Sequence, residues 1–144
     1  MTEPVQRTLT IGASPERVLA VITDFEAYPS WQKEIESTSI VQRDESGRPA
    51  QVAMVTAAMG MKANSQIALT YGTQEVSWTL VSGDMMTQND AHYVLRGNSA
   101  GGTDVDLQMA IGLKWNLPEF MMKQVITKGI NDNLKAIKRV AETD

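Results

Sequence analysis

Residues 117–142 of this chain read LPEFMMKQVITKGINDNLKAIKRVAE, and this stretch decides the fold. Its apolar residues recur at three- and four-residue spacing, which is typical of an amphipathic helix with one buried face. At ~1.5 Å per residue, such a helix would span roughly 37 Å and cross a whole small domain. The apolar face holds Met122, Ile126, Ile130, Ile137 and Ala141, flanked by Leu134 and Val140. The opposite face holds Lys128, Asp132, Lys135, Arg139 and Glu142.

The start of this helix carries two further signals. Pro118 suits the first helical turn, because the N–H that proline lacks would have no intrahelical partner there. Asn116 and Glu119 have the spacing of a capping box, in which each side chain caps a backbone N–H near the helix start. Both signals favour a helix that begins near residue 117.

Most of the chain before this helix predicts β-strands. Gly, Pro, Ser and Asn punctuate alternating apolar and polar segments, and gaps of hairpin length favour antiparallel neighbours. A helix starting at the Ser14 cap and a bend at Tyr28–Trp31, where Pro29 interrupts a second helical piece, separate the first strand from the others. The predicted strands are 5–11, 35–44, 50–59, 62–71, 74–82 and 87–96, with a last strand from Val105 to Ile111.

These elements predict an α+β fold of the helix-grip type. A curved antiparallel sheet of about seven strands would wrap around the long C-terminal helix, with two short helices after the first strand. Side chains do not always fill such a curved sheet, so a cavity between helix and sheet is expected.

Length and composition limit the classes of function that this chain can have. The 144 residues suit one domain, 1–144, and 42% hydrophobic with 21% charged residues is ordinary for a globular protein. A net charge of −4 argues against nucleic-acid binding, and the lack of cysteine excludes disulfides and thiolate chemistry. The N-terminal residues do not resemble a signal peptide and no apolar run is long enough to span a bilayer, so a cytoplasmic location without stable membrane insertion is expected.

The order of elements, with ASPERV at residues 13–18 and DFEAYPSW at residues 24–31, resembles the START-like superfamily (helix-grip, birch-pollen-allergen-like). Within it the chain is most similar to the bacterial polyketide cyclase/dehydrase and lipid-transport group, which is similar to coenzyme Q-binding proteins. Asp44 to Arg48, Gly101-Gly102-Thr103 and the terminal helix add to this resemblance. The resemblance implies an interior pocket for an apolar or amphipathic small molecule, with some relatives catalytic and many only binding.

The inward faces of the predicted strands supply candidate ligand-binding residues. They share the strand parity that faces the helix, and an ordinary filled core would contain the same residue types. These candidates are Ile67, Tyr71, Trp78, Leu80, Tyr93, Leu107 and Met109.

The long helix supplies the rest of the candidate site. Glu119, Lys123 and Asn133 fall within its apolar stripe, where a polar group needs a partner. One interpretation is a solvated pocket mouth formed by Glu119 and Lys123, which are four residues apart and could pair, beside Phe120, Met122 and Ile126. In this interpretation Asn133 meets a sheet backbone group or the polar end of a ligand. The other is a helix start that projects beyond the sheet into water.

The remaining polar residues give no catalytic or metal motif. His92 is the only histidine, and its strand parity places it on the outer face of the sheet. The same parity places Asp104 and Asp106 on the outer face, where water hydrates an aspartate side chain and no partner is needed. No metal site and no cofactor are therefore expected.

Three function hypotheses remain open. The first is binding or transport of a hydrophobic small molecule, such as a lipid, quinone or polyketide, favoured by the predicted cavity and the nine methionines. The second is a polyketide cyclase/dehydratase that acts by proton transfer in the same cavity, which leaves enzyme activity uncertain. The third is a protein-interaction module, with an unknown partner.

Overall fold

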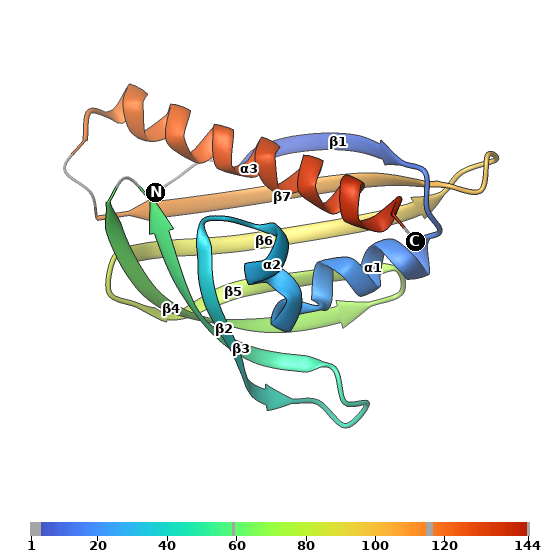
Figure 1. Ribbon diagram of the computed structural model, residues 1–144, viewed down its shortest axis with the longest axis horizontal. Helices are drawn as coiled ribbons and strands as arrows, with labels where there is room; N and C mark the ends of the chain where they lie inside the picture. Colours follow the sequence, from blue (N-terminus) through green and yellow to red (C-terminus); the bar gives the residue numbers. More distant parts are fainter. Residues whose placement is uncertain (1–3, 59, 115–116, 144) are drawn as a thin grey trace.

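A computed structural model describes residues 4–58, 60–114 and 117–143, and Figure 1 shows their arrangement. The helices are α1 (Pro15–Thr23), the short 3-10 helix η1 (Phe25–Ala27), α2 (Tyr28–Trp31) and α3 (Glu119–Ala141). The strands are β1 (Val5–Ile11), β2 (Ile35–Arg43), β3 (Pro49–Ala58), β4 (Met61–Gly72), β5 (Glu75–Gly83), β6 (Met86–Gly97) and β7 (Thr103–Leu113).

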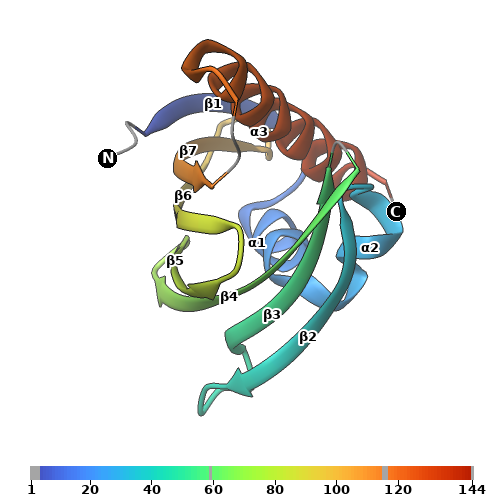
Figure 2. The ribbon, with the colours of Figure 1, turned by 90° about the vertical axis from the view of Figure 1, so that its left-hand side faces the viewer.

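The strands form one seven-stranded antiparallel sheet in the order β1-β7-β6-β5-β4-β3-β2. The sheet curves strongly, with α3 lying along its concave side and α1 and α2 at one end (Figure 2). The predicted α+β helix-grip fold is confirmed. Each predicted strand lies within two residues of an observed one, although Met59, the predicted end of strand 50–59, lies outside the described residues.

Alternation along the strands decides which residues face α3. In β6 the buried residues Ala91, Tyr93 and Leu95 alternate with neighbours that are more exposed. Tyr93 is paired with Leu107 of β7, and Val76 of β5 lies on its other side, so inward residues adjoin across the strands. His92 is exposed on the outer face, where its Nε2 lies 3.5 Å from a Glu75 carboxylate oxygen, as its parity predicts.

Helix α3 is confirmed, but it begins slightly later than predicted. Pro118 precedes the first helical residue, Glu119, and occupies the N-cap position without a side-chain cap. The carbonyl of Pro118 accepts the N–H groups of Met121 and Met122, both over 3.0 Å. Asn116, the other half of the expected capping box, lies outside the described residues.

The short helices follow local sequence signals, with one correction. Ser14 caps α1 as predicted, its Oγ accepting the N–H of Arg17 over 3.2 Å. Pro29 does not interrupt a helix: it is the second residue of α2, because a first turn needs no N–H from that position. The chain bends before the predicted Tyr28–Trp31 segment, between η1 and α2.

The core lies between the sheet and the second half of α3. Ile130, Leu134, Ile137 and Ala141 are buried against it, and α1 adds Val18 and Ile22. The Ile, Leu and Val side chains among them each contribute about 1.5–3 kcal/mol to folding when fully buried. Among the described helices, none is both long and apolar enough to cross a membrane.

Candidate ligand-binding cavity

A cavity of about 360 Å³ lies between the concave face of the sheet and the middle of α3. Ligand pockets in proteins commonly measure about 300–1,000 Å³, so this one suits a small molecule. Its apolar wall comes from the short helices, the sheet and α3. The members of that wall are Phe25, Ile35, Met54, Ala63, Trp78, Met86, Met109, Ile111, Leu113, Val125, Ile126 and Ile130.

Aromatic rings in mutual contact form one side of this cavity. Phe25 stacks on Tyr28 with ring centroids 4.8 Å apart and meets the edge of Trp78 at 5.7 Å. Trp78 in turn lies 5.4 Å from Tyr93. Such contacts fix ring orientations, so this side is rigid, whereas Met54, Met86 and Met109 supply an adaptable, polarisable surface.

Two polar contacts at the cavity are satisfied within the protein. The Asn133 amide Nδ2 donates to the Tyr93 hydroxyl over 2.9 Å, and both residues are buried. The Trp78 indole N–H donates to Asn89 Oδ1 over 3.3 Å. Burial raises the pKa of Tyr93, so its hydroxyl stays neutral at physiological pH. Tyr28 is neutral for the same reason, and its hydroxyl donates to the carbonyl of Ile22.

Two residues of the cavity lining each carry a side-chain oxygen that is buried away from the open space and has no partner among the described residues. The two oxygens are Oε1 of Gln32 and Oγ1 of Thr56. Gln32 follows α2 directly and Thr56 lies in β3, paired with Ile35. An unpaired buried polar atom costs about 1–3 kcal/mol, so each of these oxygens lowers the stability of the fold.

The charged residues that line the cavity face the solvent at its rim. Lys128 and Asp132 pair over 2.7 Å, and their side chains are 78% and 42% exposed. The hydrogen bond from Lys128 to Asp132 raises the pKa of that ammonium, and nearby Glu34 adds to the effect. Within the described chain, no three His, Cys, Asp or Glu side chains form a group that could hold a metal ion.

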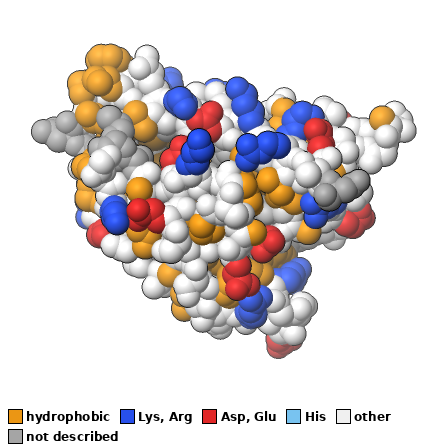
Figure 3. Space-filling view, in the orientation of Figure 1, with side chains coloured by type: hydrophobic (Ala, Val, Ile, Leu, Met, Phe, Trp, Pro, Cys, Tyr) orange, Lys and Arg blue, Asp and Glu red, His pale blue; other side chains and the backbone are white. Residues whose placement is uncertain are grey.

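The two halves of α3 pack differently, and the cavity lies where they meet. No residue from Glu119 to Gly129 is buried, and Phe120 is 67% exposed. Hydrophobic side chains gather on the surface where α3 begins, whereas Lys and Arg cover its later turns (Figure 3). A Cβ added at Gly129 would meet no heavy atom within 4 Å, which shows open space beside this turn.

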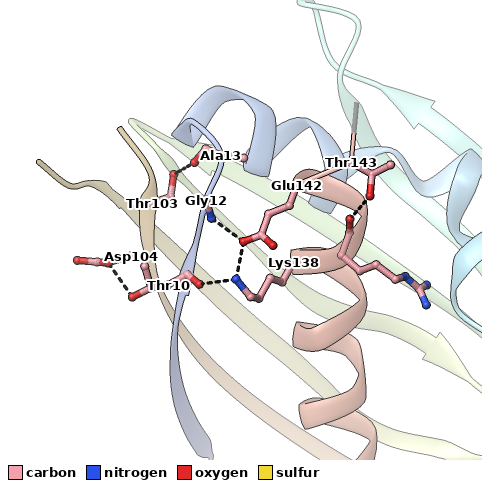
Figure 4. Close-up of polar contacts among 9 residues, drawn as sticks. Thr10, Gly12, Ala13, Thr103, Asp104, Lys138, Glu142 and Thr143 are labelled. Atoms are coloured by element: carbon pink, nitrogen blue, oxygen red, sulfur yellow. Dashed lines mark hydrogen bonds and ion pairs between the residues drawn. The ribbon is translucent and has the colours of Figure 1, made fainter. Parts of the chain in front are cut away.

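The C-terminal end of α3 is held to β1 by polar contacts, as Figure 4 shows. The Glu142 carboxylate accepts the N–H of Gly12 over 2.7 Å and pairs with Lys138, whose ammonium also donates to the Thr10 carbonyl over 3.3 Å. Arg17 of α1 donates to the carbonyl of Val140 over 3.2 Å. The helix is therefore fixed at one end and loosely packed at the other.

Five of the twelve residues predicted to bind the ligand line this cavity: Trp78, Tyr93, Met109, Ile126 and Asn133. Asn133 meets a tyrosine hydroxyl there, not the sheet backbone group that was one expectation. The other seven do not line it: Ile67, Tyr71, Leu80, Leu107, Glu119, Met122 and Lys123.

Packing explains why those seven lie elsewhere. Ile67 and Leu107 are fully buried in the filled part of the core, and the Tyr71 hydroxyl donates to the Pro49 carbonyl over 2.7 Å. Glu119 and Lys123 are exposed and form no ion pair with each other, which matches a helix start that projects into water. Leu80 and Met122 are partly exposed outside the lining.

Sequence reasoning missed several lining residues. Asn89 shares its strand parity with Ala91 and Tyr93, so an amide on an apolar strand face was the signal that could have found it. Thr56 shares parity with Met54 in the same way. Gln32 carries no such signal, because it follows a short helix and its direction depends on the fold.

A second hollow, of about 550 Å³, lies over β2, β3, β4 and the end of β5. It is larger, but half of the residues in its wall are serines and amides, and Ser37, Asn64, Ser82 and Asp84 within it are exposed to solvent. Water satisfies such groups at no cost, so this hollow is a wet surface groove. The cavity beneath α3 is the better candidate because apolar core residues wall it.

Residues 11–138 match the sequence model of the family described as polyketide cyclase / dehydrase and lipid transport. The chain belongs to this family. The resemblance to START-like proteins is thereby confirmed, and it covers most of the domain. No curated protein matches this chain.

Solved structures with the same fold extend the comparison. A START superfamily protein from Mycobacterium smegmatis is 25% identical, with 97% of each chain covered and a TM-score of 0.88. The Zhui aromatase/cyclase from Streptomyces sp. R1128 is 14% identical, with 99% of this chain and 94% of that chain covered and a TM-score of 0.79. Ara h 8.0201 is 15% identical over 100% of both chains, with a TM-score of 0.74. At such identity the last two show a shared fold alone.

Proposed function

We propose that this chain binds a hydrophobic small molecule, such as a lipid, quinone or polyketide, in the cavity beneath α3 and carries or sequesters it. The observation that supports this most is a hollow of about 360 Å³ with a largely apolar wall. Protein interiors are normally close-packed, and an empty hollow leaves its lining without partner atoms. A bound apolar molecule would restore those contacts, which is the driving force for binding.

The experiment is native mass spectrometry of the protein purified from its own host, followed by titration with panels of lipids, quinones and aromatic polyketides. We expect a small molecule to co-purify, or one class in the panel to bind with a stoichiometry of one. Absence of any co-purified molecule, together with no binding across the panels, would remove the basis of the proposal.

A cyclase/dehydratase reaction by proton transfer is the second candidate, favoured by the family's description and by the buried phenol of Tyr93 in the cavity wall. With its raised pKa, Tyr93 is suited to donate a hydrogen bond to a ligand carbonyl and is a poor base at neutral pH. If the reaction occurs, a poly-ketone incubated with the protein should lose water, and Tyr93→Phe should slow that loss by about 100-fold or more. An unchanged rate in Tyr93→Phe would exclude this role for the phenol.

A further inference from the structure

The side of α3 that faces the solvent carries a row of exposed residues. Met121, Lys128 and Lys135 follow one another at seven-residue spacing, and Arg139 lies about one turn further on. Residues at this spacing lie above one another on one side of a helix. All four residues are exposed, and they extend over about 27 Å of the helix. We call these four residues the outer row of α3.

The outer row is the cationic side of an acidic protein. Helix α3 holds five Lys or Arg and two Asp or Glu, a net charge of +3, whereas the whole chain carries −4 and the rest of it therefore −7. Lys128 pairs with Asp132 over 2.7 Å, but Lys135 and Arg139 form no ion pair with any described carboxylate. Lys and Arg gather over these turns in Figure 3. This separation of charge turns the cationic side of the protein toward an anionic surface.

Exposed apolar side chains lie at the start of the same helix. Phe120 is 67% exposed, and Met121, the first residue of the outer row, is 39% exposed. A large apolar side chain gains free energy when it leaves water for an apolar phase. Aromatic residues favour the boundary between the headgroups and the acyl chains of a bilayer. The helix thus presents an apolar end followed by a cationic row.

A bilayer with anionic phospholipids matches both parts of this surface. Its phosphates attract Lys and Arg, and each such residue near the surface strengthens binding about fivefold, the factor that about 1 kcal/mol gives. Its interfacial region also takes up exposed apolar side chains. A nucleic-acid duplex offers only the phosphates, and it would leave Phe120 and Met121 in water. The combination of charge and apolar surface therefore favours the bilayer.

We propose that the outer row of α3 docks on the surface of a bilayer that contains anionic phospholipids. Phe120 and Met121 enter the headgroup region, and the three cations of the row contact lipid phosphates. The inference goes beyond the proposed function, because docking uses the solvent side of α3 and cavity binding uses its inner side. The two sites adjoin at Lys128, which also lines the rim of the cavity. Docking therefore places this rim against the bilayer, where hydrophobic small molecules dissolve.

The test measures how the full chain sediments with vesicles of two compositions. One is phosphatidylcholine alone, and the other contains about 30% phosphatidylglycerol, which is anionic. At about 0.1 M salt, we expect binding to the anionic vesicles to be at least about tenfold tighter than binding to the neutral ones. At about 1 M salt the Debye length falls to about 3 Å, so this advantage should fall below about threefold.

A double variant tests the cations of the outer row. Lys135→Gln combined with Arg139→Gln should weaken binding to the anionic vesicles by about tenfold or more and leave binding to the neutral vesicles unchanged. The matched control is Arg43→Gln combined with Arg96→Gln. It removes two exposed cations from β2 and β6 and changes the net charge by the same amount. This control should alter binding to either kind of vesicle by less than about threefold.

A single variant tests the apolar end of the helix. Phe120→Ser should weaken binding to both kinds of vesicle by about fivefold or more, because the ring no longer leaves water. Val81→Ser, at a position of β5 that is 50% exposed, is the control and should leave vesicle binding unchanged. Binding by Phe120→Ser as tight as that of the wild type would overturn the insertion of the ring.

The remaining outcomes separate this inference from the proposed function. Equal binding to both kinds of vesicle, or equal losses in the outer-row double variant and its control, would overturn the docking surface. A protein that binds a DNA duplex through Lys135 and Arg139 but binds neither vesicle would have a nucleic-acid partner, which also overturns the proposal. Affinity for the apolar dye 1,6-diphenylhexatriene, measured without vesicles, tests the cavity alone. A protein that binds the dye but neither vesicle keeps the proposed function and loses the docking surface.

Discussion

Asn133 of α3 donates a hydrogen bond to the hydroxyl of Tyr93 in β6 over 2.9 Å, and this contact joins helix to sheet beside the cavity. Both residues line the cavity and both are buried. The contact lies near the boundary between the loosely packed first half of α3 and its buried second half. It therefore positions the helix where a ligand would lie.

Removing either partner of this pair should destabilise the protein. Tyr93→Phe leaves the Asn133 amide unpaired and Asn133→Leu leaves the Tyr93 hydroxyl unpaired, each at a cost of about 1–3 kcal/mol in the free energy of unfolding. The double variant should cost less than the sum of the two, because neither polar group remains. Urea unfolding of the four proteins measures the coupling. Additive losses would show that the two side chains do not interact.

Ile130→Asp should place an unpaired charge between α3 and the sheet, because Ile130 is only 1% exposed. We expect a loss of about 3–5 kcal/mol in the free energy of unfolding, a large share of the stability of a typical domain. Gln124→Asp, at an exposed position of the same helix, is the control and should change stability by less than about 1 kcal/mol. A melting temperature of Ile130→Asp equal to that of the wild type would mean that the sheet does not grip the helix.

Gly129→Ala should stabilise the fold. The added Cβ would meet no heavy atom within 4 Å, and alanine is favoured over glycine inside a helix by about 0.5–1 kcal/mol. The expected result is a higher urea midpoint with an unchanged slope. A lower midpoint would show that the turn at Gly129 is strained or closely packed.

The contact between Glu142 and β1 should make stability depend on pH. Hydrogen bonding by Lys138 lowers the pKa of the Glu142 carboxyl below its ordinary value of 4.5, and the N–H of Gly12 adds to the effect. A lowered folded-state pKa contributes stability that is present above the ordinary value and is lost as the pH falls through the folded value. Glu142→Gln should therefore be less stable than the wild type near pH 7. This difference should shrink as the pH falls below 4.5 and vanish once the Glu142 carboxyl is protonated in the folded protein as well. A difference that persists in acid would mean that the charge of Glu142 is not responsible.

The fold was predictable because two periodicities carry it. The alternation in β4 to β7 and the apolar stripe of α3 each indicate which side of the element is buried. A sheet and a helix that each have one apolar face can pack together in only a few ways. The errors in the predicted fold lie at the ends of helices and in the turns beside them. Pro29 was read as a break because its place within a turn depends on where α2 starts.

The site was predictable only in part, because periodicity gives a direction and not a depth. Tyr93 and Leu107 are cross-strand partners with the same inward direction, yet only Tyr93 reaches the cavity. Glu119 has the correct angle on the helical wheel, but the helix turn that carries it is exposed to solvent. Gln32 enters the cavity from a loop whose position the long-range pairing of β2 with β3 decides.

The central claim is that a hydrophobic molecule binds beneath α3, and two tryptophan substitutions one helical turn apart test it most directly. Ile126 lines the cavity and Met122 does not, although both lie on the apolar face of the helix. The measurement is the affinity for 1,6-diphenylhexatriene, read from its fluorescence. We predict that Ile126→Trp, which fills the cavity, weakens binding by about tenfold or more, a loss of about 1.4 kcal/mol, and that Met122→Trp leaves it unchanged. Equal affinity in the wild type and Ile126→Trp would contradict the account.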